Sequence, residues 1–227
     1  MKSAIQRALL LTSSFLLLTA FSPDALSQFE GIVESKNLSF DENGQEQHYM
    51  MTMWIKKGMV RIEIPAVGEN PAFTAIYRSD LGVSWMLDEA SKTFFEIRKS
   101  VEPSEDMHSP RSNLRKTGKH KTLLGYPCEQ MLTKDGDVES ELWVTGKLKG
   151  LSEELLRSLG GATSESGSGW NDEIAKMGLF PLKASTKLDG KVVEASEITS
   201  IRKVPVEQAR FEKPEGFSKQ KMEEMPK

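Results

Sequence analysis

Cysteine is almost absent from this sequence: of 227 residues, only Cys128 carries a thiol. An internal disulfide needs two cysteines, so the fold must depend on a hydrophobic core. Hydrophobic residues make up 38% of the chain, which is enough to build one. We expect Cys128 to be buried as a small apolar side chain. The alternative is a redox or intermolecular role, which Glu129 disfavours because its charge would raise the thiol pKa.

Histidine is also scarce, and the three positions do not form a metal site. His48, His108 and His120 lie far apart, and none has another ligand residue at metal-binding spacing. The sequence contains no Gly-x-Ser-x-Gly, His-Glu-x-x-His or phosphate-loop motif. We therefore expect no metal, no cofactor and no catalytic residues, and an enzyme is the weakest of the functions considered.

An excess of positive charge is lacking as well. The chain has 30 Lys and Arg against 33 Asp and Glu, a net charge of −3. Proteins that bind nucleic acid usually carry a basic surface. The composition therefore predicts no nucleic-acid partner.

Long hydrophobic runs are missing except near the start of the chain. Lys2 and Arg7 precede the apolar run 8–21, and Ala25-Leu26-Ser27 follows it. This pattern predicts a signal peptide over residues 1–27, cleaved before Gln28, and a protein exported to the periplasm or beyond the cell. The alternative is an uncleaved anchor, but the run is short for a span of about 20 residues. No transmembrane segment is expected in the mature chain.

The rest of the chain is dominated by short apolar runs that end at turn residues. Alternation in Met59–Ile64 places Val60, Ile62 and Ile64 on one face and Arg61 and Glu63 on the other. Strands recur about every ten residues, which is typical of a sandwich or barrel. The expected strands are Phe29–Phe40, Gln47–Lys56, Met59–Ile64, Phe73–Arg78, Val83–Asp88 and Thr93–Lys99.

Two Asp-Gly pairs predict hairpins in the second half of the chain. Asp135-Gly136 would join the strands Lys121–Thr133 and Val138–Thr145, and Asp189-Gly190 would join Leu182–Leu188 and Val192–Lys203. Between these hairpins we expect a helix over Leu151–Leu159, with Ser152 as its cap and Gly160-Gly161 as its stop. A second helical turn is expected over Trp170–Met177.

Several short motifs resemble the secreted bacterial family called domain of unknown function 4412. They are Gly58–Glu63, Met86–Asp88 with Thr93–Phe95, Thr117–Lys119, Leu124-Gly125-Tyr126 with Cys128, Glu141–Thr145 and Pro214–Phe217. The resemblance covers most of Phe29–Phe217. It implies a fold similar to the lipoprotein-carrier proteins of the bacterial envelope, and it brings no catalytic or binding residues to carry over.

On this basis we expect a mainly β (α+β) protein with a single domain over residues 28–217. The resemblance implies an antiparallel, incompletely closed β-barrel, or half-barrel, with one or two short helices over its concave face. The charged residues 218–227 are expected to fray.

Methionine and tryptophan gather on the expected strands, and Gln47–Ile55 is apolar on both faces. Core packing explains each residue taken alone, whereas an apolar cavity would explain the group. The candidate lining residues are Met51, Met53, Trp54, Trp85, Trp143, Leu155 and Leu159. We expect a non-catalytic protein that binds a lipid or lipoprotein acyl chain. The alternative is an interaction or structural module of the envelope, with a protein partner and no small ligand.

Overall fold

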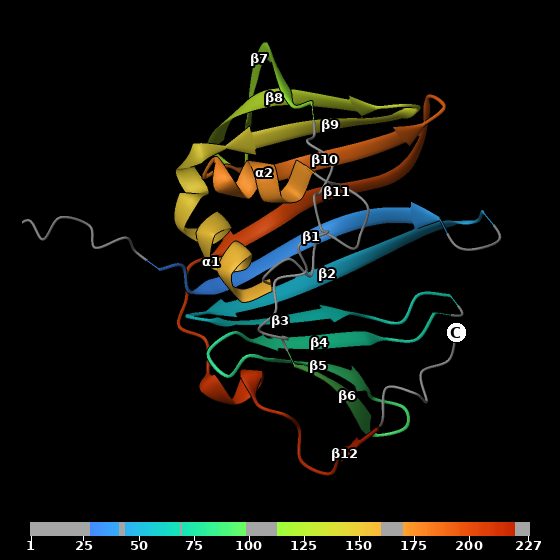
Figure 1. Cartoon of the computed structure of the whole chain (residues 1–227), viewed down its shortest axis with the longest axis vertical. Helices are drawn as coiled ribbons and strands as arrows, with labels where there is room; N and C mark the ends of the chain where they lie inside the picture. Colours follow the sequence, from blue (N-terminus) through green and yellow to red (C-terminus); the bar gives the residue numbers. More distant parts are fainter. Residues whose placement is uncertain (1–27, 41–43, 69, 99–112, 160–169, 221–227) are drawn as a thin grey trace, which may run out of the picture.

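The structure, a computed structural model, describes residues 28–40, 44–68, 70–98, 113–159 and 170–220. The expected signal peptide, residues 1–27, and His108 lie outside these ranges. The described residues form one 12-stranded sheet in the order β12-β6-β5-β4-β3-β2-β1-β11-β10-β9-β8-β7. The sheet curves into a half-barrel, and its two edge strands, β12 and β7, do not pair with each other within the described residues (Figure 1). The expected mainly β half-barrel is confirmed.

The strands follow the expected rhythm closely. Their bounds are β1 Gly31–Phe40, β2 Glu46–Lys56, β3 Met59–Ile64, β4 Phe73–Arg78, β5 Val83–Asp88, β6 Thr93–Arg98, β7 Arg115–Leu123, β8 Tyr126–Asp135, β9 Val138–Thr145, β10 Phe180–Leu188, β11 Lys191–Arg202 and β12 Ser218–Lys219. All neighbouring strands are antiparallel except β12 and β6, which are parallel.

The meander β2–β6 forms because each apolar run is followed by a turn that its residues favour. Gly58 and Gly82 adopt positive φ angles of 70° and 64° in the turns after β2 and β4, a conformation that glycine takes without steric cost. Strand β1 then pairs with β2 on one side and β11 on the other. This long-range pairing joins the two halves of the chain into one sheet.

The central hairpin differs from the prediction. Instead of one strand over Lys121–Thr133, the chain turns at Leu124-Gly125 and forms β7 and β8. Leu124 and Gly125 both have positive φ, 49° and 79°, as a tight hairpin turn requires. The prediction was wrong here because a leucine in this conformation is unusual, and the apolar residues on either side suggested continuity.

The two Asp-Gly hairpins are present, with one difference in the turn. Asp189 and Gly190 are the central residues of their turn, with φ of 50° and 77°. In the other hairpin Asp135 still pairs with Val138, so the central residues are Gly136 and Asp137. Gly136 alone has a positive φ there, 58°, as in a turn with glycine at its first central position.

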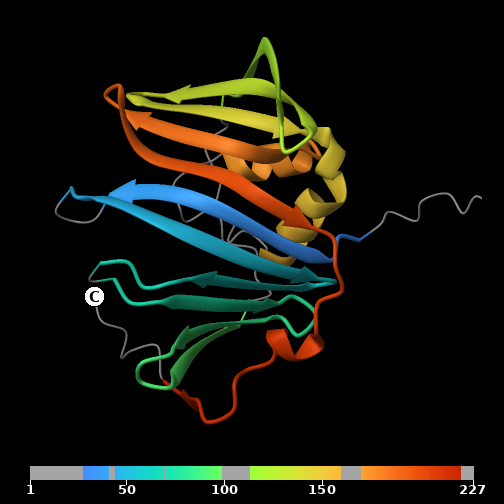
Figure 2. The same cartoon turned by 180° about the vertical axis from the view of Figure 1, so that it is seen from behind.

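The two helices α1, Lys149–Leu159, and α2, Trp170–Lys176, lie on the concave face of the sheet. Seen from behind in Figure 2, neither helix lies in front of the convex face. The expected helices are therefore confirmed, but Ser152 is not the cap. The α-helix begins at Lys149, and the Ser152 hydroxyl instead donates a 2.7 Å hydrogen bond to the carbonyl of Leu179.

The C-terminal segment, residues 204–217, returns along the other half of the sheet. It contains the short helix η3, Gln208–Phe211, and leads into β12. Ser218 and Lys219 pair with β6, and the N–H of Gln220 donates to the carbonyl of Phe94. The expected frayed tail therefore does not include residues 218–220, and residues 221–227 lie outside the described part of the chain.

Candidate binding surfaces

The concave face of the sheet is apolar beneath α1. Residues directly opposite each other on paired strands share a face. Met53 lies opposite Val33, and Ile55 lies opposite Val60. These side chains form one buried cluster with Leu151 of α1. This cluster is the part of the core that holds the helix against the sheet.

Hydrogen bonds at a buried carboxylate fix α1 in this position. Glu154 is fully buried and accepts a 2.7 Å bond from the N–H of Gly58. The Ser158 hydroxyl donates to the same carboxylate oxygen at 3.1 Å. Because a buried carboxylate is costly unless it is hydrogen-bonded, these contacts hold the helix to the turn between β2 and β3.

Exposure on the concave face increases with distance from this turn. Along β2, Ile55 is fully buried, Met53 is 6% exposed and Met51 is half-buried. Along β3, Val60 is fully buried and Ile62 is half-buried. The strand register places other half-buried apolar side chains from β3 to β6 on the same face as Met51 and Ile62. We call this set the open concave face, and it consists of Met51, Ile62, Ile64, Tyr77, Met86, Phe95 and Ile97.

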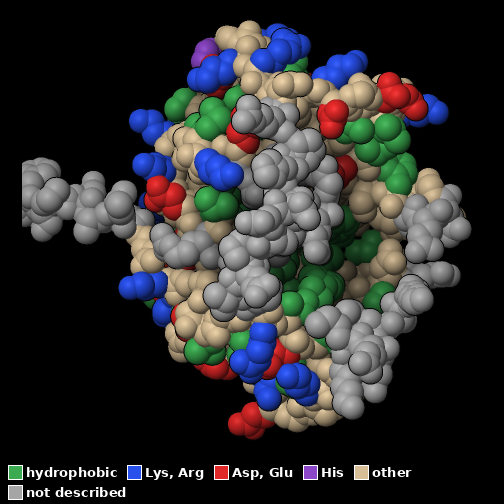
Figure 3. All heavy atoms as spheres, in the orientation of Figure 1, with side chains coloured by type: hydrophobic (Ala, Val, Ile, Leu, Met, Phe, Trp, Pro, Cys, Tyr) green, Lys and Arg blue, Asp and Glu red, His purple; other side chains and the backbone are tan. Residues whose placement is uncertain are grey.

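The space-filling view shows what this gradient produces. In Figure 3 the face that carries the helices is hollowed, and hydrophobic side chains lie at the bottom of the hollow. Burial raises the pKa of the Tyr77 hydroxyl on this face above its usual value. The hollow therefore has an apolar floor.

The sequence-based candidates for the cavity lie in two clusters. Met51, Met53, Trp143, Leu155 and Leu159 belong to or pack against the cluster beneath α1. Trp54 and Trp85 pack against a separate cluster that includes Val206 and Phe211 of the C-terminal segment. Strand register explains the separation, because Trp54 follows Met53 directly and therefore points to the opposite face.

The C-terminal segment covers the convex face of β3–β6. Phe211 is fully buried there. The Arg78 guanidinium donates to the carbonyl of Phe211 at 3.2 Å and to the Glu212 carboxylate at 3.0 Å, and it pairs with Asp80 at 2.8 Å. The sequence predicted no helix or strand in this segment. Its apolar residues Val206, Phe211 and Phe217 are the signal that could have revealed the packing.

Trp143 belongs to the same contiguous cluster as Met53, but the strand register pairs it with Lys183 and so places it on the convex face, where the β7–β8 hairpin contacts it. The Lys121 Nζ lies 3.8 Å from the centroid of the Trp143 ring, and the indole N–H donates to Glu141 at 2.8 Å. Burial lowers the pKa of the Lys121 ammonium. Cys128 belongs to the same cluster, is 2% exposed and has a pKa raised by burial, so the expected buried cysteine is confirmed.

Among the described residues, no group of three or more His, Cys, Asp or Glu side chains is arranged to hold a metal ion. In the same part of the chain, no helix is long and apolar enough to cross a membrane. His48 and His120 are exposed.

These features define an open antiparallel half-barrel with an apolar concavity. The family model described as Domain of unknown function (DUF4412) matches residues 29–217, and the chain belongs to this family. The resemblance noted from the short motifs is therefore confirmed.

Solved structures provide weaker likenesses. An uncharacterized conserved protein from Thermus thermophilus is 11% identical, over 84% of this chain and 91% of that one, with a TM-score of 0.48. A LolA superfamily protein from Nitrosomonas europaea is 10% identical, over 82% and 91%, with a TM-score of 0.34. PNGF-II is 12% identical, over 84% of this chain but 31% of that one, with a TM-score of 0.41. No curated protein matches the sequence.

Proposed function

We propose that this protein is a non-catalytic carrier that binds a lipid or the acyl chain of a lipoprotein on its open concave face. The observation that carries the proposal is the row of half-buried apolar side chains that continues beyond α1. Folded proteins rarely leave large contiguous apolar patches in water without a partner.

The position of α1 supports a site that is only partly filled by the protein itself. The helix packs where Ile55 and Val60 are fully buried. Farther along the same strands, Met51 and Ile62 are half-buried. A ligand in the remaining space would gain roughly 25 cal/mol for each Å² of apolar surface removed from water.

The side chains of this lining favour a binding free energy that depends on how much apolar surface is buried, and not on specific polar contacts. Ile62, Ile64, Met86 and Phe95 contribute hydrocarbon or thioether surface, and methionine adapts to irregular apolar shapes. Such a surface would tolerate different chain lengths and head groups, as a carrier of acyl chains requires.

The location that we propose is the bacterial envelope or the exterior. The basic start, the apolar run 8–21 and the small residues before Gln28 are the pattern that signal peptidases cleave. N-terminal sequencing of the exported protein tests this directly. A mature chain that begins at or near Gln28 supports export, and a retained Met1 contradicts it.

The binding proposal is tested by titration with Nile red, an uncharged apolar probe. Met51→Lys places a charge on the open concave face and is expected to weaken probe binding at least tenfold, because burying an unpaired charge is costly. The matched control is Thr52→Lys on the opposite face, where Glu34 and Glu63 lie on either side of the new lysine. Met53 is a poorer site for this test because it is almost fully buried in the core.

Mass spectrometry of an organic extract of the purified mature protein identifies a natural ligand. A lipid present in the wild-type extract and depleted in Met51→Lys supports the carrier. If the wild type binds no probe and yields no lipid, the carrier proposal is wrong, and an interaction or structural module takes its place.

A further inference from the structure

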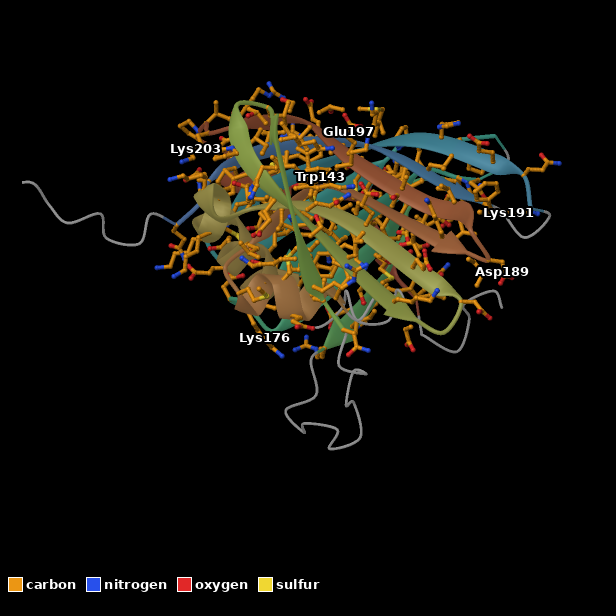
Figure 4. All side chains as sticks on the ribbon, turned by 90° about the horizontal axis from the view of Figure 1, so that it is seen from above. Trp143, Lys176, Asp189, Lys191, Glu197 and Lys203 are labelled. Carbon is orange, nitrogen blue, oxygen red and sulfur yellow. The ribbon has the colours of Figure 1, made fainter. Side chains whose placement is uncertain are left out.

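A separate groove lies on the convex face of the sheet, which is the face opposite α1. It is a groove of about 340 Å³ over strands β10, β11, β1 and β2. This volume falls within the range of small-ligand sites, ~300–1,000 Å³. The groove is lined by Lys36, Asn37, Leu38, His48, Tyr49, Met50, Lys183, Ala195, Ser196 and Glu197. Figure 4 shows Glu197 on one side of the sheet and Lys176 of α2 on the other.

The floor of the groove is apolar. Leu38 lies between His48 of β2 and Ala195 of β11 in the strand register. The Met50 side chain is 47% exposed, and its residue lies opposite Lys36. Apolar surface also continues along β1 to Phe40, which is 40% exposed and shares this face. From Lys36 to Phe40 the strand rises by roughly 14 Å, at about 3.4 Å per residue.

One end of the groove carries more positive than negative charge. The ammonium groups of Lys36 and Lys183 both contact the same oxygen of Glu197, at 3.4 Å and 2.9 Å. One carboxylate cannot neutralise two ammonium groups. Both lysine side chains remain accessible, at 58% and 43% exposure, so their other N–H donors can reach a ligand.

We propose that this groove binds a fatty acid, a straight alkyl chain with a terminal carboxylate. The carboxylate would pair with Lys36 and Lys183 and complete their neutralisation, while the alkyl chain would lie on Leu38, Met50 and Ala195. Charge-assisted hydrogen bonds favour a carboxylate over an uncharged head group. The site is separate from the open concave face and does not depend on the proposed function.

The test is isothermal titration calorimetry of the mature protein with laurate below its micelle concentration. Saturable binding is expected, and the part of it that belongs to the groove is the part that Lys183→Glu weakens. Dodecylamine, with the same chain length and opposite charge, should lose no affinity in Lys183→Glu. Lys183→Glu and Met50→Glu should each weaken laurate binding at least tenfold, because Met50→Glu places a carboxylate opposite Lys36. Lys191→Glu is the control, since it makes the same charge change on β11 but does not line the groove.

Met51→Glu separates this site from the concave one, because residues 50 and 51 point to opposite faces. A saturable laurate site that persists in Met51→Glu and is weakened when Met50→Glu is added to that variant supports the groove, because Met51→Glu weakens only the acyl-chain binding on the concave face. Loss of all laurate binding in Met51→Glu alone overturns it. So does an equal loss of dodecylamine affinity in Lys183→Glu, or an equal loss of laurate affinity in Lys191→Glu. Absence of any laurate binding overturns it too, whereas the proposed concave site is judged by Nile red alone.

Discussion

The Glu154 side chain accepts a 2.7 Å hydrogen bond from the backbone N–H of Gly58, so a fully buried carboxyl group on α1 is tied to the turn between β2 and β3. Gly58 has a φ of 70°, and its carbonyl accepts a 2.9 Å bond from the N–H of Ser79. One turn therefore connects the helix to β4 as well as to β2 and β3. This connection holds α1 against the buried end of the concave face.

Removing this carboxylate should loosen the helix. Glu154→Ala leaves the N–H of Gly58 and the hydroxyl of Ser158 without this acceptor, and an unsatisfied buried group costs about 1–3 kcal/mol. We expect the free energy of unfolding, measured by urea denaturation, to fall by that amount. Glu153→Gln is the control, because its 3.6 Å pair with Lys149 is near the surface and contributes well under 1 kcal/mol. Equal losses in the two variants would contradict this role of Glu154.

The C-terminal segment should depend on Arg78. Its side chain is 7% exposed and bonds Asp80, Phe211 and Glu212 at once. Arg78→Lys loses the planar two-pronged contact with Asp80, and we expect a loss of about 1–3 kcal/mol and faster proteolysis within residues 204–217. Arg98→Lys, at a side chain that is 73% exposed, should change neither measurement noticeably. Unchanged proteolysis in Arg78→Lys would show that apolar packing alone holds the segment.

Glu96 should make the protein sensitive to acid. Hydrogen bonds from Lys219, from the Trp85 indole and from Arg98 lower the pKa of its carboxyl from 4.5 to about 2. A group whose pKa is lower in the folded state stabilises the fold above its unfolded pKa and loses this contribution as pH falls toward the folded value. Stability should therefore decrease between about pH 4.5 and pH 2, and Glu96→Gln should show a smaller decrease. Thermal unfolding at a series of pH values measures this, and identical profiles would contradict the assignment.

Cys128 should react slowly with a thiol reagent in the native protein. It is 2% exposed, and burial raises its pKa, so little reactive thiolate is present at neutral pH. In denaturing urea the same thiol should react rapidly. Fast native labelling would instead show that the β7–β8 hairpin opens from the cluster around Trp143.

Much of the fold could be predicted because its signals are local. In Met59–Ile64, alternation and the glycine turn act within a few residues, and the bounds of β3 match the prediction. The turn at Leu124-Gly125 was missed because one of its positions holds a leucine, for which a positive φ is unusual. The candidate cavity could be predicted only as a group of apolar residues, since spacing along the chain does not say what covers each face.

The sequence by itself determined the class of fold, the strand rhythm and the unusual strand β2, which is apolar on both faces. Only the tertiary structure decided what each face of β2 meets. Trp54 packs in the cluster with the C-terminal segment, where Arg210 lies 4.7 Å from its ring, while Met53 packs beneath α1. These partners come from distant parts of the chain, so their positions depend on the pairing of β1 with β11. No local pattern encodes that pairing, because no turn joins β1 to β11, and their register is set by which side chains the whole sheet buries on each face.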